Sequence, residues 1–324
     1  MRKIRNRKRK MNVFFAVILL ALVLYTALMF TLFVFGINIS LKSPYQVDNL
    51  SEIFNLPNLK YWKWPYVMEP DHEGIFGNYL DVFERLKLDE TKGYIVGLFN
   101  KELVEARIQG DILTCSLYTI LYAGVGALCA TFMPMFMGYL CSMYKNKVSS
   151  IIYALVLFVI ATPIVGATPS AVNFMRSIRL YDTFVGEWLR RSTFTNMYFL
   201  IFFAYFRGLS SGFSEAAEID GASQLSIMFR IYMPLALNIF FTVYLMIFVA
   251  YWNDFTTPMM FLPSKPTLSY LVYYRTTYDS GGDLNYATKR MAALMIFAIP
   301  IIILFSIFNK RLMTNLTMGG VKEW

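Results

Sequence analysis

The residues best suited to chemistry lie in one short polar segment between apolar stretches, residues 214–234, which read SEAAEIDGASQLSIMFRIYMP. Its carboxylates are Glu215, Glu218 and Asp220, and the segment holds no histidine or cysteine. Carboxylates can bind a basic partner, and in the first turn of a helix they stabilise its positive end. We therefore expect a contact surface here and no catalytic residues.

Other chemically active residue types are sparse. Cys115, Cys129 and Cys141 fall in one uncharged run and match no metal-ligand spacing, so we interpret them as packing residues. His72 is the single histidine, and one histidine in a polar loop is usually solvated. No Gly-Lys-Ser/Thr Walker pattern occurs, so we expect no ATP hydrolysis by this chain. The sequence predicts no cofactor and no metal in the chain itself.

The composition is that of a membrane protein. Of 324 residues, 57% are hydrophobic and 16% are charged, against about 25% charged in soluble domains. The net charge is +9, and seven basic residues fall within the first ten. Beside a long apolar run, such a cluster favours a cytoplasmic anchor at anionic lipid headgroups over a nucleic-acid site.

Six uncharged runs predict an all-α polytopic protein with six transmembrane helices, because about 20 residues cross a bilayer. The fourth run is short, and we expect Trp188, Leu189 and Leu209 to extend it. The runs are 11–37, 112–144, 148–175, 192–206, 231–253 and 291–309.

Orientation follows from the basic N-terminus, which we expect to remain in the cytoplasm. The domains are then a cytoplasmic tail at 1–12, a first helix at 13–37, a large extracytoplasmic loop at 38–110, a transmembrane core at 111–309 and a cytoplasmic tail at 310–324. Counting crossings places 209–234 in the cytoplasm and both termini inside. The segment 176–192 is basic although this count places it outside the membrane, and it is the one observation that argues against the orientation.

The polar segment predicts a short capped helix. Ser214 is a suitable N-cap, Glu215 and Glu218 would lie in the first turn, and Gly221 can take the left-handed conformation that ends a helix. Pro234 suits the first turn of the next crossing helix. A helix of about two turns is unstable alone and needs a partner. An ordinary solvated loop with a capped turn is the alternative.

The spacing Glu215-Ala216-Ala217, three residues, Gly221, nine residues, Ile231, one residue, Met233-Pro234 resembles the EAA loop of ABC importer permeases. Its one departure is Met233 at a leucine position. The sequences WNDF (252–255), LTMGGVKEW (316–324) and NYLDVF (78–83) are similar to parts of maltose-type sugar permeases, the tail to that of the shorter permease subunit. The external loop from 43 to 78 and the segment after 83 look longer than is usual in that family.

The resemblance implies the type I ABC importer permease fold and a coupling helix that docks on a cytoplasmic ATPase dimer, which binds ATP and Mg. It also implies a second, homologous permease subunit and an extracytoplasmic substrate-binding protein. Glu215 would meet a basic residue of the ATPase, and the C-terminal tail would reach its dimer interface. The residues that the resemblance assigns to coupling are Glu215, Ala216, Ala217, Asp220, Gly221 and Pro234, with Gly319, Gly320 and Lys322 in the tail.

The predicted function is a multi-pass permease subunit in the cytoplasmic membrane, surrounded by lipid, that translocates a di- or oligosaccharide or a related polyol. No residue can be assigned to the substrate. A permease for peptides or amino acids would share the EAA loop. A polytopic membrane enzyme or scaffold would work without an ATPase, so co-purification with a nucleotide-binding subunit separates these classes.

Overall fold

The computed structural model describes residues 13–49, 51–63, 74–85, 111–144, 146–162, 166–277 and 286–318, without the side chains of 13, 85, 305 and 307–318. These residues form helices and their connections, and no strand occurs among them. The chain divides into two compact units, Met1–Arg85 with Asp279–Ile296, and Leu86–Tyr278 with Phe297–Trp324. The predicted all-helical class is confirmed in the described residues.

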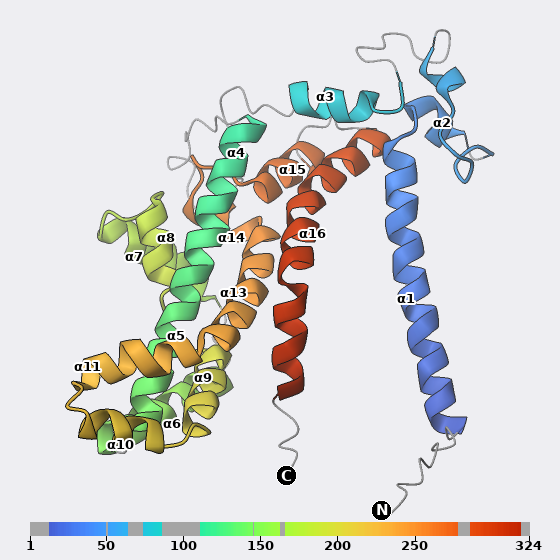
Figure 1. The fold of residues 1–324 in the computed structure, drawn as a ribbon. Helices are drawn as coiled ribbons and strands as arrows, with labels where there is room; N and C mark the ends of the chain where they lie inside the picture. Colours follow the sequence, from blue (N-terminus) through green and yellow to red (C-terminus); the bar gives the residue numbers. More distant parts are fainter. Residues whose placement is uncertain are drawn as a thin grey trace, which may run out of the picture. The chain divides into compact units, whose positions relative to one another are not determined.

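The first unit is built on α1 (Val13–Ser40), which is an uninterrupted helix (Figure 1). The apolar side chains of α1 are exposed over most of its length. Short helices follow α1 in the sequence. Asn78, in one of these helices, donates hydrogen bonds from Nδ2 to the carbonyls of Ser40 (2.8 Å), at the end of α1, and Lys42 (2.7 Å). Lys289 forms an ion pair with Asp81 at 2.8 Å. The remaining elements of this unit are α2 (Pro44–Asp48), η1 (Leu59–Trp62), α3 (Gly77–Arg85) and the beginning of α16 (Ala287–Met318).

The second unit is a helical bundle around α5 (Gly126–Met143). Helix α5 packs against α6 (Lys147–Ala161), α8 (Phe184–Arg191), α9 (Met197–Arg207) and α13 (Leu237–Trp252). A Cβ on Gly138 would lie 2.9 Å from the Cβ of Phe202, so this glycine permits the close approach of α5 and α9. The other helices are α4 (Ile112–Thr119), η2 (Ile120–Val125), α7 (Ala167–Ser177), α10 (Gly212–Ile219), α11 (Gln224–Ile227), η3 (Met228–Tyr232), α12 (Met233–Leu235), α14 (Thr256–Phe261) and α15 (Leu268–Thr277).

Aromatic side chains fill the core of this bundle. Tyr139, Phe206 and Tyr232 are buried, and both neighbouring rings lie 5.4 Å from the Tyr139 ring between centroids. Cys141 packs with Val156 and Phe199, and Cys115 is also buried. The interpretation of these two cysteines as packing residues is confirmed.

Three described helices are long and apolar enough to span a membrane: Phe14–Ser40, Ile112–Met143 and Ala287–Leu304. A fourth span results if Gln224–Leu235 and Leu237–Trp252, which meet at a bend of 65°, are counted together. Two further apolar helices, α6 and α9, are shorter. The first, second and sixth apolar runs therefore coincide with long helices.

Two expectations about the crossing helices were wrong. The run 148–175 is two helices, because α6 ends at Ala161 and α7 begins at Ala167. Thr162 precedes a proline in the sequence and is extended (ψ 114°), as residues before proline prefer. Trp188 and Leu189 do not extend the fourth run, because they belong to α8, and Asn196 caps a separate helix, α9.

Candidate functional sites: a coupling segment and a buried polar network

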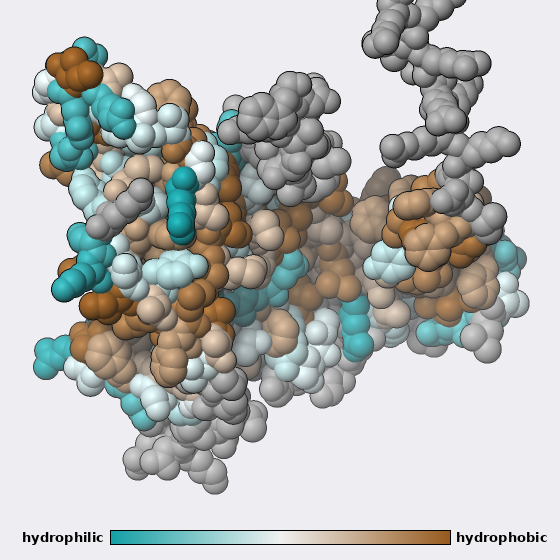
Figure 2. All heavy atoms as spheres, turned by 90° about the horizontal axis from the view of Figure 1, so that it is seen from below, coloured by the Kyte–Doolittle hydropathy of each residue, from teal (hydrophilic) through white to brown (hydrophobic). Residues whose placement is uncertain are grey.

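The segment predicted to contact a partner forms two short helices, α10 and α11, with Gly221 at the turn between them. Gly221 has φ of +77°, the left-handed conformation expected of it, and a Cβ there would meet no atom within 4 Å. The helix pair is held by a hydrogen bond from Gln224 Nε2 to Glu218 Oε1 (2.8 Å). Hydrophilic side chains gather on the side of the second unit where α10 and α11 lie (Figure 2).

The expected capping of this helix was partly wrong. Helix α10 begins at Gly212, two residues before the expected N-cap Ser214, whose hydroxyl instead donates to the Ser211 carbonyl at 2.8 Å. Glu215 lies in the first turn as expected, whereas the earlier start places Glu218 near the C-terminal end. Only one of the two glutamates is therefore placed to interact favourably with the N-terminal end of the dipole.

The two alanines of the segment differ in exposure. Ala216 is exposed, but Ala217 is buried within the chain, at 9% exposure, and its carbonyl accepts a hydrogen bond from Ala222 N (2.9 Å). The tip of the segment also exposes large apolar side chains, Ile219 at 86% and Leu225 at 67%. Apolar groups at an exposed tip suit a surface that another protein covers.

The segment continues directly into a crossing helix. Helix α11 runs through the π-helical turn η3 into α12, and the chain then bends by 65° before α13. Pro234 lies within α12, ahead of that bend, and not in the first turn of α13 as the sequence predicted. A proline removes one backbone donor, and a π-turn and a bend are ways in which helices accommodate that loss.

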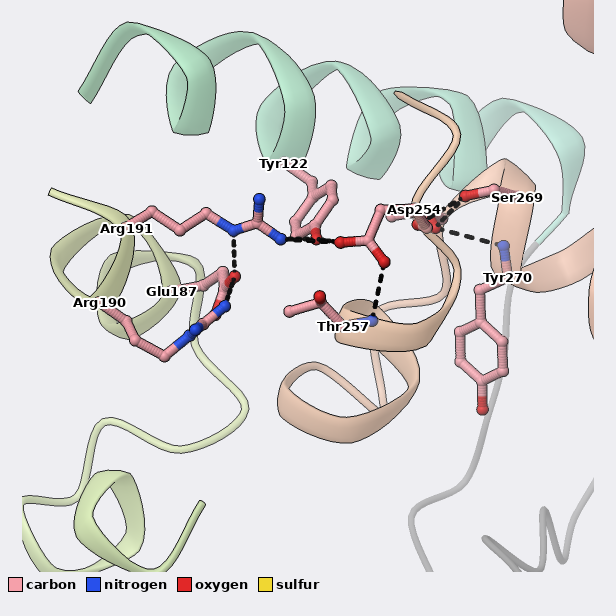
Figure 3. A network of polar contacts seen from close by, with 9 residues as sticks. Tyr122, Glu187, Arg190, Arg191, Asp254, Thr257, Ser269 and Tyr270 are labelled. Atoms are coloured by element: carbon pink, nitrogen blue, oxygen red, sulfur yellow. Dashed lines mark hydrogen bonds and ion pairs between the residues drawn. The ribbon is translucent and has the colours of Figure 1, made fainter. Parts of the chain in front are cut away.

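A buried polar network lies at the other end of α13, where Asp254 follows the helix (Figure 3). Arg191 of α8 is its centre. Its Nη2 lies 3.0 Å from Asp254 Oδ2 and also donates to the Tyr122 hydroxyl, and its Nε donates to Glu187. Tyr122 in turn donates to Asp254 Oδ2 at 2.8 Å, which closes a three-residue ring.

Further groups satisfy the rest of the network (Figure 3). Arg190 makes a two-point contact with Glu187 at 2.7 and 2.8 Å, and Thr257 N donates to Asp254 Oδ1 at 3.0 Å. The Arg191 guanidinium also lies 3.5 Å from the ring centroid of Tyr251. The two arginines and two carboxylates balance in charge, as a buried ionic cluster requires.

The surroundings of Asp254 favour the ionised form of its carboxyl group. Burial by itself would raise the pKa of its carboxyl group, but hydrogen bonds from Thr257 and Tyr122 and the charge of Arg191 outweigh burial and hold the pKa below its ordinary value. A polar cleft of about 300 Å³ adjoins the network, lined among others by Asn196, Tyr198 and Thr193.

Sequence reasoning missed this network. Asp254 was considered only as part of the sequence WNDF. Arg190 and Arg191 were considered only as part of the basic segment that argued against the predicted orientation. One local signal was present, since Glu187 and Arg191 are four residues apart and would face each other on a helix. The contacts of α8 with Tyr122 and Asp254 could not be predicted in this way, because these two residues lie far from α8 in the sequence. The tail residues Gly319, Gly320 and Lys322 lie outside the described residues, as do the basic N-terminal run and His72.

The apolar helices and their exposed polar segment define an all-helical, multi-pass membrane protein. The chain belongs to the family described as the inner membrane component of binding-protein-dependent transport systems, which matches residues 130–317. It is thus a transporter subunit and not itself an enzyme. The family membership predicted from the EAA spacing is confirmed.

Relatives and a solved structure agree with this assignment. The chain is 24% identical over 228 residues to the trehalose transport system permease protein SugB of Mycobacterium tuberculosis (strain CDC 1551 / Oshkosh), covering 70% of this chain and 80% of SugB. It is 29% identical over 194 residues to the arabinooligosaccharides transport system permease protein AraQ of Bacillus subtilis (strain 168), covering 59% of this chain and 67% of AraQ.

A third match, to the inner membrane ABC transporter permease protein YcjP of Escherichia coli (strain K12), is 32% identical over 120 residues but spans only 37% of this chain and 42% of YcjP. The fold resembles a chain in the crystal structure of a bacterial ABC transporter involved in the import of the acidic polysaccharide alginate. That likeness has a TM-score of 0.68 at 19% identity and covers 92% of this chain and 96% of the other.

Proposed function

We propose that this chain is the translocating permease subunit of an ABC importer for a di- or oligosaccharide or a related polyol. The observation that carries the proposal is the family match over 130–317, which includes the exposed helix pair around Gly221. The names of SugB and AraQ, which specify trehalose and arabinooligosaccharides, support a carbohydrate substrate.

The proposed topology is that of a type I importer permease: six crossings, both termini in the cytoplasm, and a large extracytoplasmic loop at 38–110. The three long helices and the bent pair support four crossings. Helices α6 and α9 supply the other two, although their 15 and 11 residues span only roughly 22 and 17 Å by helical rise. Irregular chain must complete these crossings within the protein, where its backbone groups can find partners.

The proposed partners are a second, homologous permease subunit, an external binding protein and a cytoplasmic ATPase dimer that binds ATP and Mg. Glu215, Ala216, Asp220 and Gly221 would form the contact with the ATPase, joined by Gly319, Gly320 and Lys322 of the tail. Exposed Ile219 and Leu225 extend this contact with apolar surface. Ala217 is buried within this chain, so it would not touch the ATPase and would instead pack α10 against the rest of the subunit.

The path of the chain suggests how motion would pass through this subunit. A displacement of α10 and α11 would act on η3, α12 and the 65° bend before it reaches α13. At the far end of α13, Asp254 is tied to Arg191 and Tyr122. We therefore infer that the polar network is the anchor against which α13 moves when the ATPase dimer closes.

Uptake by the reconstituted assembly tests this function. The chain, its companion permease, the ATPase and the binding protein are placed in vesicles, and labelled oligosaccharides, polyols and peptides are offered with internal or external ATP. We expect ATP-dependent accumulation of a carbohydrate alone. Accumulation of peptides alone would instead favour a peptide permease, and failure of the chain to co-purify with any nucleotide-binding subunit would contradict the importer assignment.

A further inference from the structure

A second cleft in the larger unit, of about 920 Å³, lies where the end of α5, the start of α6 and the end of α9 converge. We call it the α5–α6–α9 cleft. Its walls are partly apolar, with Cys141, Ile151, Tyr153 and Phe203, and its polar rim contains Lys147 and Arg207. The family resemblance assigns no role to this cleft, and neither the coupling contact nor the polar network uses it.

The charges of the cleft are unbalanced. Lys147 and Arg207 come from different helices, and no carboxylate is among the lining residues. Within the described part of the chain, neither cation takes part in an ion pair. Two cations facing one cleft without a counter-ion repel each other, so an anion bound between them would be stabilised.

The apolar part of the cleft continues along the surface of α6. The ring of Tyr153 lies 4.7 Å from that of Phe203, which forms the cleft wall between α6 and α9. Beyond it, Ile151, Leu155 and Phe158 follow one another at the four- and three-residue spacing of a helix face, with exposures of 65, 48 and 71%. A ligand that fits this surface has an anionic head and an apolar tail.

We propose that the α5–α6–α9 cleft binds the phosphate headgroup of an anionic phospholipid in the cytoplasmic leaflet, with an acyl chain lying along α6. The choice of leaflet rests on the proposed topology, in which Lys147 follows the second crossing and Arg207 ends the fourth. Basic pockets between transmembrane helices on the cytoplasmic side are a known way of recognising such headgroups. Phosphate is the shared chemistry, and the apolar stripe favours lipid over a soluble phosphate.

The bound lipid would brace the base of the coupling segment. Arg207 lies five residues before the start of α10, and Tyr144, at the end of α5, donates from its hydroxyl to Gln224 Oε1 of α11 at 3.1 Å. The cleft and the coupling helices thus share the same supporting elements. A headgroup that draws Lys147 and Arg207 together would hold α6 and α9 at a set distance beneath α10.

Lipid retention by the purified full-length chain tests the proposal. The chain is exchanged into nanodiscs of phosphatidylcholine with increasing phosphatidylglycerol, released, and analysed for bound lipid by native mass spectrometry. We compare wild type with Lys147→Gln/Arg207→Gln and with the control Arg179→Gln/Arg230→Gln, which removes two exposed arginines outside the cleft.

We expect preferential retention of phosphatidylglycerol by the wild type and by the control variant. In Lys147→Gln/Arg207→Gln the preference should fall roughly twenty-five-fold, because each cation lost contributes about five-fold. Equal retention by this variant and the wild type overturns the proposal. The proposal is also overturned if excess inorganic phosphate releases the lipid and remains bound in its place, because that result assigns the cleft to a soluble phosphate.

The leaflet is tested separately from transport. Ser149→Cys places a thiol at the cleft, and a membrane-impermeant maleimide is added to right-side-out and inside-out vesicles, with the wild type as the background. Labelling from the cytoplasmic side supports the assignment, and labelling from outside alone overturns the leaflet. Neither readout requires sugar uptake, so failure of the lipid site and failure of the proposed function give different results.

Discussion

Arg191 and Asp254, 63 positions apart in the chain, meet with a separation of 3.0 Å between Nη2 and Oδ2. Each also bonds to the Tyr122 hydroxyl, so α8, η2 and the end of α13 are joined through one hydroxyl and one ion pair. Charged groups inside an apolar bundle are costly unless they are fully partnered. Here they are partnered on every side, which makes the network sensitive to the removal of Arg191, Asp254 or Tyr122.

Replacing Arg191 with alanine should destabilise the protein strongly. Glu187 is 2% exposed and Asp254 is half-buried, and both would lose a cation. Leaving a buried charge without its partner costs about 3–5 kcal/mol. Thermal unfolding in detergent, followed by circular dichroism, measures the loss.

Arg190→Ala is the matched control for that change. Arg190 pairs with the same glutamate, but its side chain is 30% exposed, and pairs open to water contribute only about 1 kcal/mol or less. Equal destabilisation by the two substitutions would show that the connection of Arg191 to Asp254 and Tyr122 adds nothing.

Tyr122→Phe removes one hydroxyl and keeps the ring. It should cost about 1–3 kcal/mol, because the hydroxyl donates to Asp254 and accepts from Arg191 in a buried site. Tyr251→Phe should be close to neutral, because Tyr251 contacts Arg191 through the face of its ring, which phenylalanine retains. The unfolding midpoints of the two variants in the same detergent test this difference. A larger loss of stability in Tyr251→Phe than in Tyr122→Phe would contradict the prediction.

The stability contributed by Asp254 should depend on pH in one direction. Its pKa in the folded chain is held below the ordinary value of an aspartate, so the carboxylate stabilises the fold above that ordinary value and loses this effect as the pH falls through the depressed pKa. The difference in stability between wild type and Asp254→Asn should therefore be constant from about pH 5 to 8. Below about pH 3.8 it should shrink, and a difference that changes near pH 7 would assign the effect to another group.

Gly138→Ala should weaken the packing of α5 on α9. The added Cβ would lie 2.9 Å from Phe202 Cβ and 3.0 Å from the backbone nitrogen of Phe203, and overpacking of this kind costs about 1–3 kcal/mol. Gly124→Ala, earlier in the same long helical stretch, meets only the Tyr244 hydroxyl at 3.9 Å and should be tolerated. Unfolding of both variants in detergent measures the contrast, and similar stabilities would contradict the contact.

Glu215→Lys and Gly221→Val should abolish ATP-driven uptake while membrane insertion remains intact. The first reverses a charge in the first turn of α10, and the second puts a β-branched side chain at φ +77°. Gly208→Val is the control, since Gly208 has φ −81° and lies just before the segment. Uptake in vesicles with matched amounts of inserted protein is the measurement. Full uptake by either coupling variant would refute the assignment of this segment.

Much of the architecture could be predicted from composition and spacing because the bilayer imposes simple rules. An apolar run of 27 residues such as 11–37 has few alternatives to a helix, and α1 covers it from Val13 onward. The left-handed Gly221 was also predictable, because a short helix followed by glycine leaves the chain little choice. The start of α10 was predicted wrongly, because Ser214 was expected to cap the helix, whereas the helix begins at Gly212.

The sequence by itself determined the membrane class, the long helices, the short polar helix that ends at Gly221 and, through the EAA spacing, the family. These features depend on residues near one another in the chain, where hydrophobicity, capping and backbone freedom act. The tertiary structure decided which distant groups meet: Arg191 with Asp254 and Tyr122, and Lys147 with Arg207 at one cleft. Such contacts depend on how helices pack, and packing joins residues whose separation in the chain follows no period.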